Sequence, residues 1–213
     1  MSVLVSAESW LCPPGWTGIV ALDGAILATV PDPDLIEPLQ AALLHCVGGI
    51  DADVDLTRLP TDLPAVDVLG PAALAYLDAE NFAAAHADIE VESLPTDHHE
   101  VRGLVASVAK QDADESGLEE IDSTAFVVRM GQDVVAAAGY RPWLNTAAHL
   151  SVLTAPEYRD RGLARLVASA AVADALRNRL VPQWRARPEP SRRVARALGF
   201  REFGSQISVQ LGR

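Results

Sequence analysis

Six consecutive residues, Arg159-Asp160-Arg161-Gly162-Leu163-Ala164, place two guanidinium groups beside a glycine. A guanidinium offers up to five N–H donors to a phosphate, and a glycine lets an anion approach the backbone closely. The chemistry that these residue types favour is therefore the binding of a phosphate or a similar anion.

Two regular elements are expected on either side of this segment. The run His149-Leu150-Ser151-Val152-Leu153-Thr154 is short, apolar and rich in β-branched residues, which predicts a strand, and Pro156 follows it. After the segment, apolar residues recur at helical spacing: Leu163, Leu166, Val167, Ala170 and Ala171. A helix that starts here directs its unpaired backbone N–H groups and its partial positive charge at one point, which suits a phosphate.

Arg159, Gly162 and Ala164 match the cofactor signature Arg/Gln-x-x-Gly-x-Gly/Ala, and the chain here resembles the GNAT-type N-acetyltransferase superfamily. The resemblance implies that this loop holds the pyrophosphate of acetyl-coenzyme A, and that the preceding strand pairs with the pantetheine arm. The cofactor-binding residues expected from it are Val152, Leu153, Thr154, Arg159, Asp160, Arg161, Gly162, Leu163, Ala164 and Ser191.

A second segment carries the same resemblance. Pro182-Gln183-Trp184, Ser191 and Leu198-Gly199-Phe200 are similar to the distal segment of a GNAT subgroup with a Pro-x-Trp strand. Two departures stand out: Pro188 replaces an Asn that contacts the cofactor in many members, and Ala195 replaces a Tyr that protonates the leaving thiolate. The cofactor site therefore transfers from the family, whereas its usual general acid does not.

The expected reaction is the attack of an amine on the thioester of acetyl-CoA. An alkylamine with a pKa near ~10.4 is neutral about once in 2,500 molecules at pH 7, which costs roughly 4.6 kcal/mol. A carboxylate or a histidine that removes the proton lowers that cost. Glu120, before the second predicted hairpin, and His149, at the start of the central strand, are the candidate catalytic residues; Glu119 and Asp122 are further acids nearby.

Charge is distributed unevenly along the chain. Residues 1–140 hold 4 basic and 24 acidic side chains, whereas residues 141–213 hold 13 basic and 5 acidic ones, within a total of −12. A polyanion such as coenzyme A is attracted to the second part, and the first part favours a cationic acceptor, either a small molecule or a peptide. The acidic total disfavours nucleic-acid binding.

At 213 residues, with 49% hydrophobic and 22% charged residues, the chain has the composition of a folded globular protein. It has no run of ~20 apolar residues that could span a membrane and no secretory signal. Cys12 and Cys46 lack metal-ligand spacing and are expected to be reduced thiols in a cytoplasmic protein. The pair His98-His99 has no third ligand nearby, so no metal site is predicted.

The element pattern predicts an α/β (α+β) fold with a GNAT-like mixed, twisted sheet flanked by helices. From Thr124 onward the chain gives the order strand–strand–strand–helix–strand–helix–strand, and the resemblance covers roughly residues 86–213. Residues 1–85 form an N-terminal extension with a β-hairpin at 16–30. Within the extension we expect a loop from Gly48 to Pro71 and a short helix at Ala72–Leu77. Residues 111–120 are expected to form an acidic loop.

The sequence thus predicts an acetyl-CoA-dependent N-acetyltransferase that acetylates a primary amine by direct attack in a ternary complex. The alternative is a non-catalytic acyl-CoA-binding or regulatory module, which the replaced Tyr and Asn would favour. A third possibility is that residues 1–85 form a partner-binding or acceptor-binding lobe, with homodimerisation through the apolar hairpin.

Overall fold

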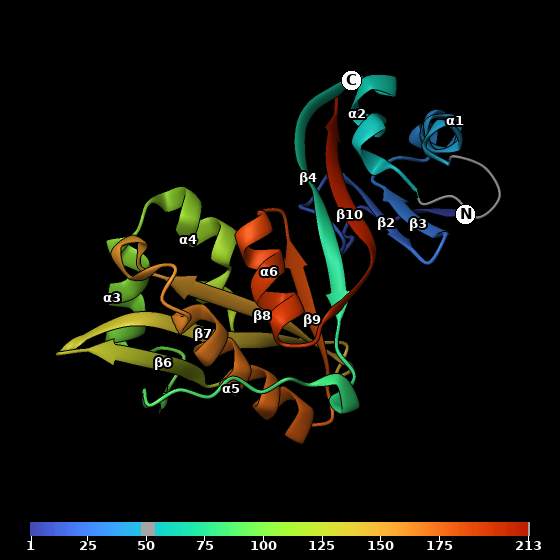
Figure 1. Cartoon of the computed structure of the whole chain (residues 1–213). Coiled ribbons are helices and arrows are strands. Elements are labelled where there is room, and N and C mark those ends of the chain that lie inside the picture. Colours follow the sequence, from blue (N-terminus) through green and yellow to red (C-terminus); the bar gives the residue numbers. More distant parts are fainter. Residues whose placement is uncertain (48–53, 213) are drawn as a thin grey trace. The chain divides into compact units, whose positions relative to one another are not determined.

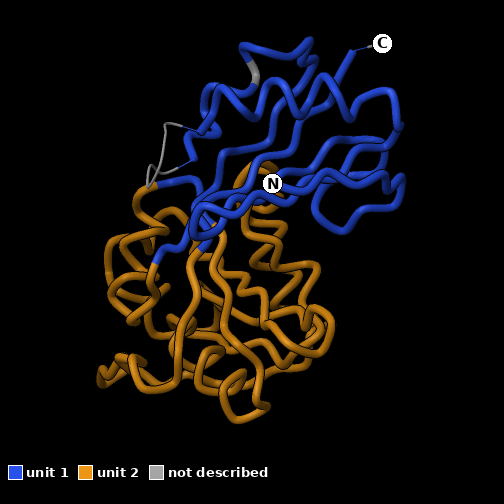
Figure 2. The backbone as a smooth tube through the Cα atoms, turned by 90° about the vertical axis from the view of Figure 1, so that its right-hand side faces the viewer, with its two compact units in different colours: residues 1–74, 186–188, 202–213 blue, residues 75–185, 189–201 orange. Residues whose placement is uncertain are grey.

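The computed structural model describes residues 1–47 and 54–212. The chain forms two compact units, which Figure 2 distinguishes by colour. Unit 1 contains Met1–Leu74, Ala186–Pro188 and Glu202–Arg213, and unit 2 contains Ala75–Arg185 and Glu189–Arg201. This division differs from the one predicted at residues 85 and 86, because residues 75–85 belong to unit 2 and the last strand belongs to unit 1.

Unit 1 is built on a mixed sheet. Its strands are β1 (Ser2–Val5), β2 (Thr17–Leu22), β3 (Ala25–Val30), most of β4 (Ala65–Tyr76) and most of β10 (Arg201–Leu211). The predicted hairpin is confirmed as β2 and β3, which are antiparallel, while β1 runs parallel to β3 and β10 runs antiparallel to β2. Strand β4 lies beside β10.

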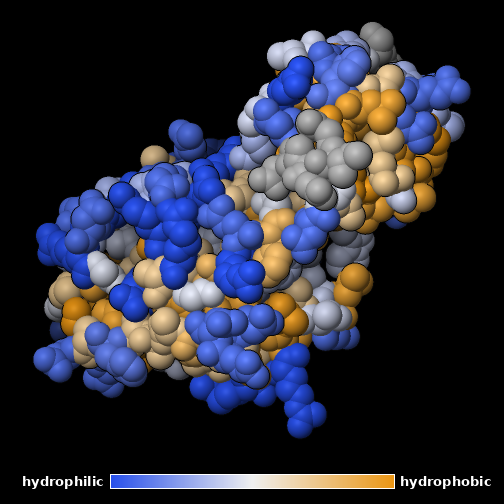
Figure 3. Space-filling view, turned by 45° about the vertical axis from the view of Figure 1, so that its right-hand side comes forward, coloured by the Kyte–Doolittle hydropathy of each residue, from blue (hydrophilic) through white to orange (hydrophobic). Residues whose placement is uncertain are grey.

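Helix α1 (Ile36–Cys46) covers this sheet together with shorter turns of helix. The shorter elements are η1 (Pro33–Leu35), η2 (Leu56–Arg58) and α2 (Leu59–Asp62). Leu39 and Leu43 of α1 pack with Ile19 and Ile207 of the sheet, and all four side chains are fully buried. Hydrophobic residues also remain among hydrophilic ones on the surface of unit 1 (Figure 3).

Two sequence expectations in the N-terminal extension were wrong. The predicted helix at Ala72–Leu77 and the end of the predicted loop are both part of strand β4. Residues 48–53 of that loop lie outside the described residues. Alanine and leucine favour a helix locally, but pairing within a sheet overrides this preference.

The strands of unit 2 are mixed in direction and have helices on both faces (Figure 1). They are β5 (Glu92–Leu94), β6 (Ala125–Met130), β7 (Asp133–Trp143), β8 (Ala147–Thr154) and β9 (Val181–Ala186). The strands from β5 to β8 are consecutive antiparallel neighbours, whereas β9 runs parallel to β8. The expected order of strands and helices in this region is confirmed.

The helical elements of unit 2 complete the domain. They are η3 (Ala79–Asn81), α3 (His99–Ser107), α4 (Lys110–Ser116), η4 (Leu118–Glu120), η5 (Pro156–Tyr158), α5 (Leu163–Arg177) and α6 (Glu189–Ala197). The expectation of a loop at residues 111–120 was wrong, since α4 and η4 lie there. Gly117, between them, has a φ of +61° and so ends α4 in the left-handed conformation that glycine favours.

Residue parity along β7 determines which side chains face which helices. Tyr140 hydrogen-bonds through its hydroxyl to Asp174 Oδ2 of α5 at 2.8 Å, so the even-numbered residues from Ala136 onward in β7 face α5. A Cβ on Gly139 would overlap Ile121, which follows η4, so the odd-numbered residues face η4. We call these the α5 face and the η4 face of the sheet.

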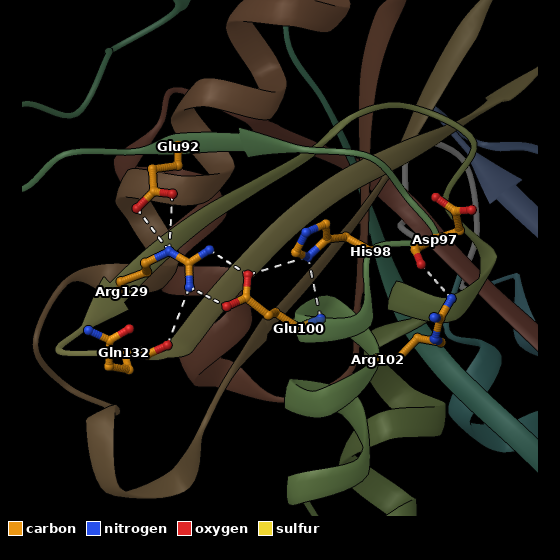
Figure 4. Close-up of polar contacts among 7 residues, drawn as sticks. All are labelled: Glu92, Asp97, His98, Glu100, Arg102, Arg129 and Gln132. Atoms are coloured by element: carbon orange, nitrogen blue, oxygen red, sulfur yellow. Dashed lines mark hydrogen bonds and ion pairs between the residues drawn. The ribbon is translucent and has the colours of Figure 1, made fainter.

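A charged cluster attaches α3 to the sheet. Figure 4 shows Arg129 of β6 between two carboxylates: its Nε donates to Glu92 of β5 at 3.0 Å, and its Nη1 donates to Glu100 of α3 at 2.6 Å. His98 is the N-cap of α3, and its Nδ1 accepts the N–H of Glu100 at 3.4 Å. One half of the predicted histidine pair therefore serves to cap a helix, and the described residues contain no cluster that could hold a metal ion.

Candidate active site

Strands β8 and β9 separate partway along their length. Their register joins three residues of β8 to three of β9: Ala147 to Val181, Ala148 to Pro182, and His149 to Gln183. Beyond His149, β8 stays paired with β7 as far as Thr154, but within residues 1–47 and 54–212 no strand pairs with its other edge. The second half of β8 therefore presents backbone N–H and C=O groups that an extended ligand can pair with.

The chain leaves β8 through a turn that ends at the start of α5. Asp160 and Gly162 in this turn have φ values of +60° and +78°. Gly162 is the N-cap residue of α5, so no side chain caps the helix, and the first turn contains no acidic residue. A Cβ on Gly162 would meet nothing within 4 Å. The helix end is thus uncapped, positive and open, which are the properties of an anion site.

Thr154, the last residue of β8, has an unsatisfied hydroxyl. Its side chain is 9% exposed, and its Oγ1 has no hydrogen-bond partner among the described residues. A buried hydroxyl without a partner costs free energy, so such a group in a native protein calls for an explanation. Its place at the end of the free β8 edge, directly before the α5 turn, makes a ligand atom the expected partner.

Arg159 and Arg161 are held by neighbouring residues. The Nη2 atom of Arg159 lies 2.8 Å from Oδ2 of Asp112 on α4, and its Nε donates to the Thr154 carbonyl at 3.4 Å. Arg161 donates to the Glu157 carbonyl at 3.0 Å, and its guanidinium carbon lies 5.1 Å from the centre of the Tyr158 ring. Backbone N–H groups are therefore better placed than these side chains to meet a phosphate.

Arg165 is a residue that the sequence reasoning missed. It lies in the first turn of α5, its side chain is exposed, and no described residue forms a hydrogen bond or an ion pair with it. Its signal was present in the sequence, because it follows the signature by one residue. It supplies the free positive charge that Arg159 and Arg161 do not.

The structure brings the predicted cofactor residues into one continuous segment, apart from Ser191. Leu153 and Leu163 are buried in the core, so only their backbone groups can serve a ligand. Ser191 of α6 accepts a hydrogen bond from Nε1 of Trp184 at 3.0 Å, which gives its hydroxyl a packing role. That these residues bind acetyl-CoA stays a prediction.

The distal segment packs as expected. Trp184 and Phe200 are 5% and 3% exposed, and their rings meet edge to face with centroids 5.4 Å apart. Gly199 ends α6 with a φ of +98°, and a Cβ there would overlap the carbonyl oxygen of Asn81. Ala195, at the position of the family's tyrosine, is buried.

His149 lies at the last β8–β9 pair, on the η4 face. Its Nδ1 is 2.9 Å from Oε1 of Gln183, whose Nε2 donates to the Tyr76 hydroxyl at 2.8 Å. The ring stacks on Trp143 with centroids 4.9 Å apart. Since Oε1 can only accept, Nδ1 carries the proton and Nε2 of the neutral ring keeps its lone pair.

The surroundings of His149 keep it neutral. Burial is the largest cause that lowers its pKa, to about 4, and the positive charge of Arg185 on β9 is the next. Gln183 favours the charged form, but it does not outweigh these effects. At pH 7 the imidazole is therefore neutral and keeps the lone pair on Nε2, but a pKa of about 4 makes it a weak base that holds a proton only briefly.

Glu120 reaches the same face from η4. Its Oε2 lies 3.5 Å from Nη1 of Arg141, the β7 residue that is paired with His149 in the ladder. Asp122 Oδ2 lies 3.8 Å from Nε of the same arginine. The two predicted catalytic residues are thus on one face of the sheet, with Arg141 as the link between them. Sequence reasoning missed Arg141, Gln183 and Arg185, since strand pairing alone brings them together.

Glu119 faces a different feature. With Asp97 it contributes to the lining of a pocket of about 330 Å³ whose apolar lining is Val101, Val105, Leu118 and Ile121. Glu119 therefore lines the pocket beside α3, whereas the adjacent Glu120 contacts Arg141 in the cluster around His149.

A free strand edge leads to an uncapped helix N-terminus, and a neutral histidine lies where the strands separate. This α/β arrangement is suited to an extended anionic ligand beside a proton acceptor. Residues 123–205 match the family model described as GNAT acetyltransferase. This part of the chain is therefore similar to a GNAT acetyltransferase domain, and the mixed α/β fold is that of GNAT-family structures.

Solved structures share the fold of this chain. A GNAT-family protein from Novosphingobium aromaticivorans is 22% identical, with a TM-score of 0.54 over 68% of this chain and 65% of its own. A GCN5-related N-acetyltransferase from Kribbella flavida is 16% identical, with a TM-score of 0.55 over 72% of this chain and 62% of its own. A GNAT-family acetyltransferase from Colwellia psychrerythraea is 14% identical, with a TM-score of 0.54 over 86% of this chain and 75% of its own.

The first two alignments cover less than two thirds of the other protein. No curated protein matches the chain. None of the helices in the described part of the chain has the length and hydrophobicity that crossing a bilayer requires.

Proposed function

We propose that the protein is an acetyl-CoA-dependent N-acetyltransferase that acetylates a primary amine by direct attack within a ternary complex. The observation that carries this proposal is the separation of β8 from β9 beyond His149, which leaves a strand edge that leads directly to the uncapped start of α5.

The residues present fit this ligand. The free edge of Leu150–Thr154 can pair with the amide groups of a pantetheine arm, and the orphaned Thr154 hydroxyl lies at the end of that edge. The N–H groups of the first turn of α5, together with Arg165, would hold the pyrophosphate. A helix end contributes roughly 0.3–1 kcal/mol and a micromolar complex needs about 8 kcal/mol, so strand pairing and burial must supply most of the affinity.

When bound, acetyl-CoA supplies an acetyl thioester, so that attack by the amine nitrogen forms the amide bond, breaks the carbon–sulfur bond and releases the thiol. The chain's part is to deliver a neutral amine. The positive charges of Arg185 and Arg141 that help lower the pKa of His149 also lower the pKa of an ammonium group placed beside it. His149 Nε2 is then the candidate acceptor for the proton, and Glu120, which contacts Arg141 on the same face of the sheet, is the second candidate.

Paired substitutions at Gly162 test the cofactor site. Gly162→Glu and Gly162→Gln impose the same strain, because either side chain must adopt the positive φ of this position. Only the glutamate adds a negative charge at the proposed phosphate position. We expect Gly162→Glu to be at least as stable as Gly162→Gln, because a negative charge suits a helix N-terminus, and yet to lose more acetyl-CoA affinity, measured by isothermal titration calorimetry.

An assay of thiol release across a panel of amines tests the activity itself. Acetyl-CoA-dependent release that requires an amine supports the enzyme. If acetyl-CoA does not bind to the wild-type protein, the proposal is wrong.

One observation favours a second candidate, a non-catalytic acyl-CoA-binding module. Ala195 is buried where the family's tyrosine would stand, so this position offers no hydroxyl to protonate a leaving thiolate. Tight binding of acetyl-CoA without turnover of any amine would select this candidate.

A further inference from the structure

Arg185 lies just beyond the point where β9 and β8 separate. His149 and Gln183 form the last pair of the ladder, and Arg185 is two residues further along β9. Side chains alternate along a strand, so Trp184 packs against Ser191 of α6 while Gln183 and Arg185 lie on the η4 face. Arg185 thus belongs to the same face as His149.

The guanidinium of Arg185 has no direct partner. No described residue forms a hydrogen bond with it or an ion pair within 4 Å, although its side chain is exposed enough to meet a ligand. Arg141, by contrast, is held by Glu120 and Asp122. The cluster therefore contains one compensated arginine and one uncompensated arginine.

Electrostatics agree with this geometry. The protein packed around Arg185 lowers its pKa, and the charge of Glu120 only partly offsets this effect. Arg185 in turn lowers the pKa of His149. Its charge is thus felt at the proton acceptor, and the nearest carboxylate does not neutralise it.

We propose that the acceptor is an amine that also carries a carboxylate, and that Arg185 binds this carboxylate. A planar guanidinium matches a carboxylate with two parallel hydrogen bonds, and such charge-assisted pairs are strong where water is partly excluded. With the carboxylate on Arg185, the amino group of a small amino acid lies on the side of His149 and Glu120. This inference rests on the proposed function, because it names the acceptor of the same site.

This acceptor differs from the cationic one that the charge of residues 1–140 suggested. Charges further apart than about 8–10 Å are screened at physiological ionic strength, so the total charge of a chain segment does not determine what its site attracts. The local charge beside His149 comes from Arg141 and Arg185, which are both in the basic part of the sequence.

Matched amines provide the test. Each set contains an amino acid, its carboxamide and the amine without the carboxyl carbon, for example leucine, leucinamide and isopentylamine. We expect wild-type kcat/KM to be ~10- to 100-fold higher for the amino acid than for its two analogues, through a lower KM. Equal kcat/KM values within every set, or a preference for the analogues, would overturn the proposal.

Variants then assign the effect to Arg185. In Arg185→Gln the ratio of kcat/KM for the amino acid to kcat/KM for its analogues is expected to fall to about one, while the Kd of acetyl-CoA stays unchanged; Arg185→Lys is expected to restore part of this ratio. The control is Arg179→Gln, an exposed arginine at the other end of α5, which should leave the preference intact. A structural role for Arg185 would instead lower activity equally for all amines.

The two proposals can fail separately. If acetyl-CoA binds but no amine is turned over, the acetyltransferase proposal fails. The role of Arg185 can then still be decided by calorimetric titration of the same amine sets into the CoA-bound protein. Stronger binding of the amino acid that depends on Arg185 supports the proposed role. Equal binding of the amino acid and its analogues contradicts that role.

Discussion

Thr154→Val is expected to stabilise the protein and to weaken acetyl-CoA binding at the same time. The Thr154 hydroxyl is buried at the end of β8 and has no hydrogen-bond partner among the described residues. Valine has nearly the same shape and the same preference for strands, and it replaces the hydroxyl with a methyl group. The substitution therefore removes one polar group and changes little else.

The sizes of the two effects follow from the Thr154 hydroxyl without a ligand, where it has no partner, and with a ligand that hydrogen-bonds to it. Burying a hydroxyl without a partner costs ~1–3 kcal/mol in mutational data, so its removal should raise the free energy of unfolding by about 1 kcal/mol or more. If the ligand supplies the missing partner, the variant loses one hydrogen bond of ~0.5–1.5 kcal/mol, which weakens binding by about 2- to 10-fold.

Thr17 provides a matched control. It lies on β2 of unit 1, is 1% exposed, and its Oγ1 is likewise without a partner in the described part of the chain. Thr17→Val should stabilise the protein by a similar amount without any change in acetyl-CoA affinity. Urea unfolding and calorimetric titration measure the two quantities. A Thr154→Val variant that is destabilised, or that binds acetyl-CoA as tightly as the wild type, would refute the reasoning.

Three further predictions concern single residues. The folded-state pKa of His149, about 4, lies below its unfolded value near ~6.5. The neutral ring therefore contributes ~3 kcal/mol to the free energy of unfolding. This contribution is complete above pH ~6.5 and is lost as the pH falls towards 4. In His149→Asn the free energy of unfolding in urea should vary less with pH over this range. Arg129 lowers the pKa of Glu100, so the ion pair between them stabilises the fold at pH values above the ordinary glutamate pKa. This stabilisation disappears when Glu100 is protonated in acid. Glu100→Gln should therefore lower the melting temperature at pH 7 but change it little at pH 3. Gly199→Ala should destabilise the protein by at least ~2 kcal/mol, because φ at this position is positive and the new Cβ would overlap a carbonyl oxygen. Gly103→Ala, in open space within α3, should instead stabilise it by ~0.5–1 kcal/mol. Urea unfolding measures both changes.

Each of these has an outcome that contradicts it. A pH profile of His149→Asn parallel to that of the wild type would show that the buried ring is not the source of the acid sensitivity. An unchanged melting temperature at neutral pH in Glu100→Gln would mean that the ion pair with Arg129 adds nothing to stability. Equal stability of the two alanine variants would contradict the backbone argument.

The parts of the fold that were predictable have strong local signals. The hairpin of β2 and β3 carries Asp23-Gly24 between two apolar runs, and α5 carries a long apolar stripe that begins after Gly162. Strand β4 gives no such signal, since Ala72–Leu77 favours a helix and becomes a strand beside β10. Helix α4 is short and acidic, and its ends are defined only by the flanking loop and by Gly117.

The same distinction applies to the candidate site. The phosphate turn was visible because its residues are contiguous in sequence. The cluster around His149 was only half visible: Glu120 and His149 could be named as acid and base candidates, but Gln183 and Arg185 join them through the register of two parallel strands that are separated by the whole of α5. No residue pattern specifies that register in advance.

Strand β8 separates the two halves of the proposed reaction by residue parity. Thr154 faces α5, where the proposed anion site lies, whereas His149 faces η4, on the same side as Glu120, Arg141 and Arg185. Only the backbone of β8 lies between the two faces, so the bond that is made must form at the free strand edge just beyond His149. A ligand that comes from the α5 face can then meet an amine that comes from the η4 face without either passing through the other's site. Substitutions on the even positions should therefore change the Kd of acetyl-CoA, and those on the odd positions should change the selection of the acceptor.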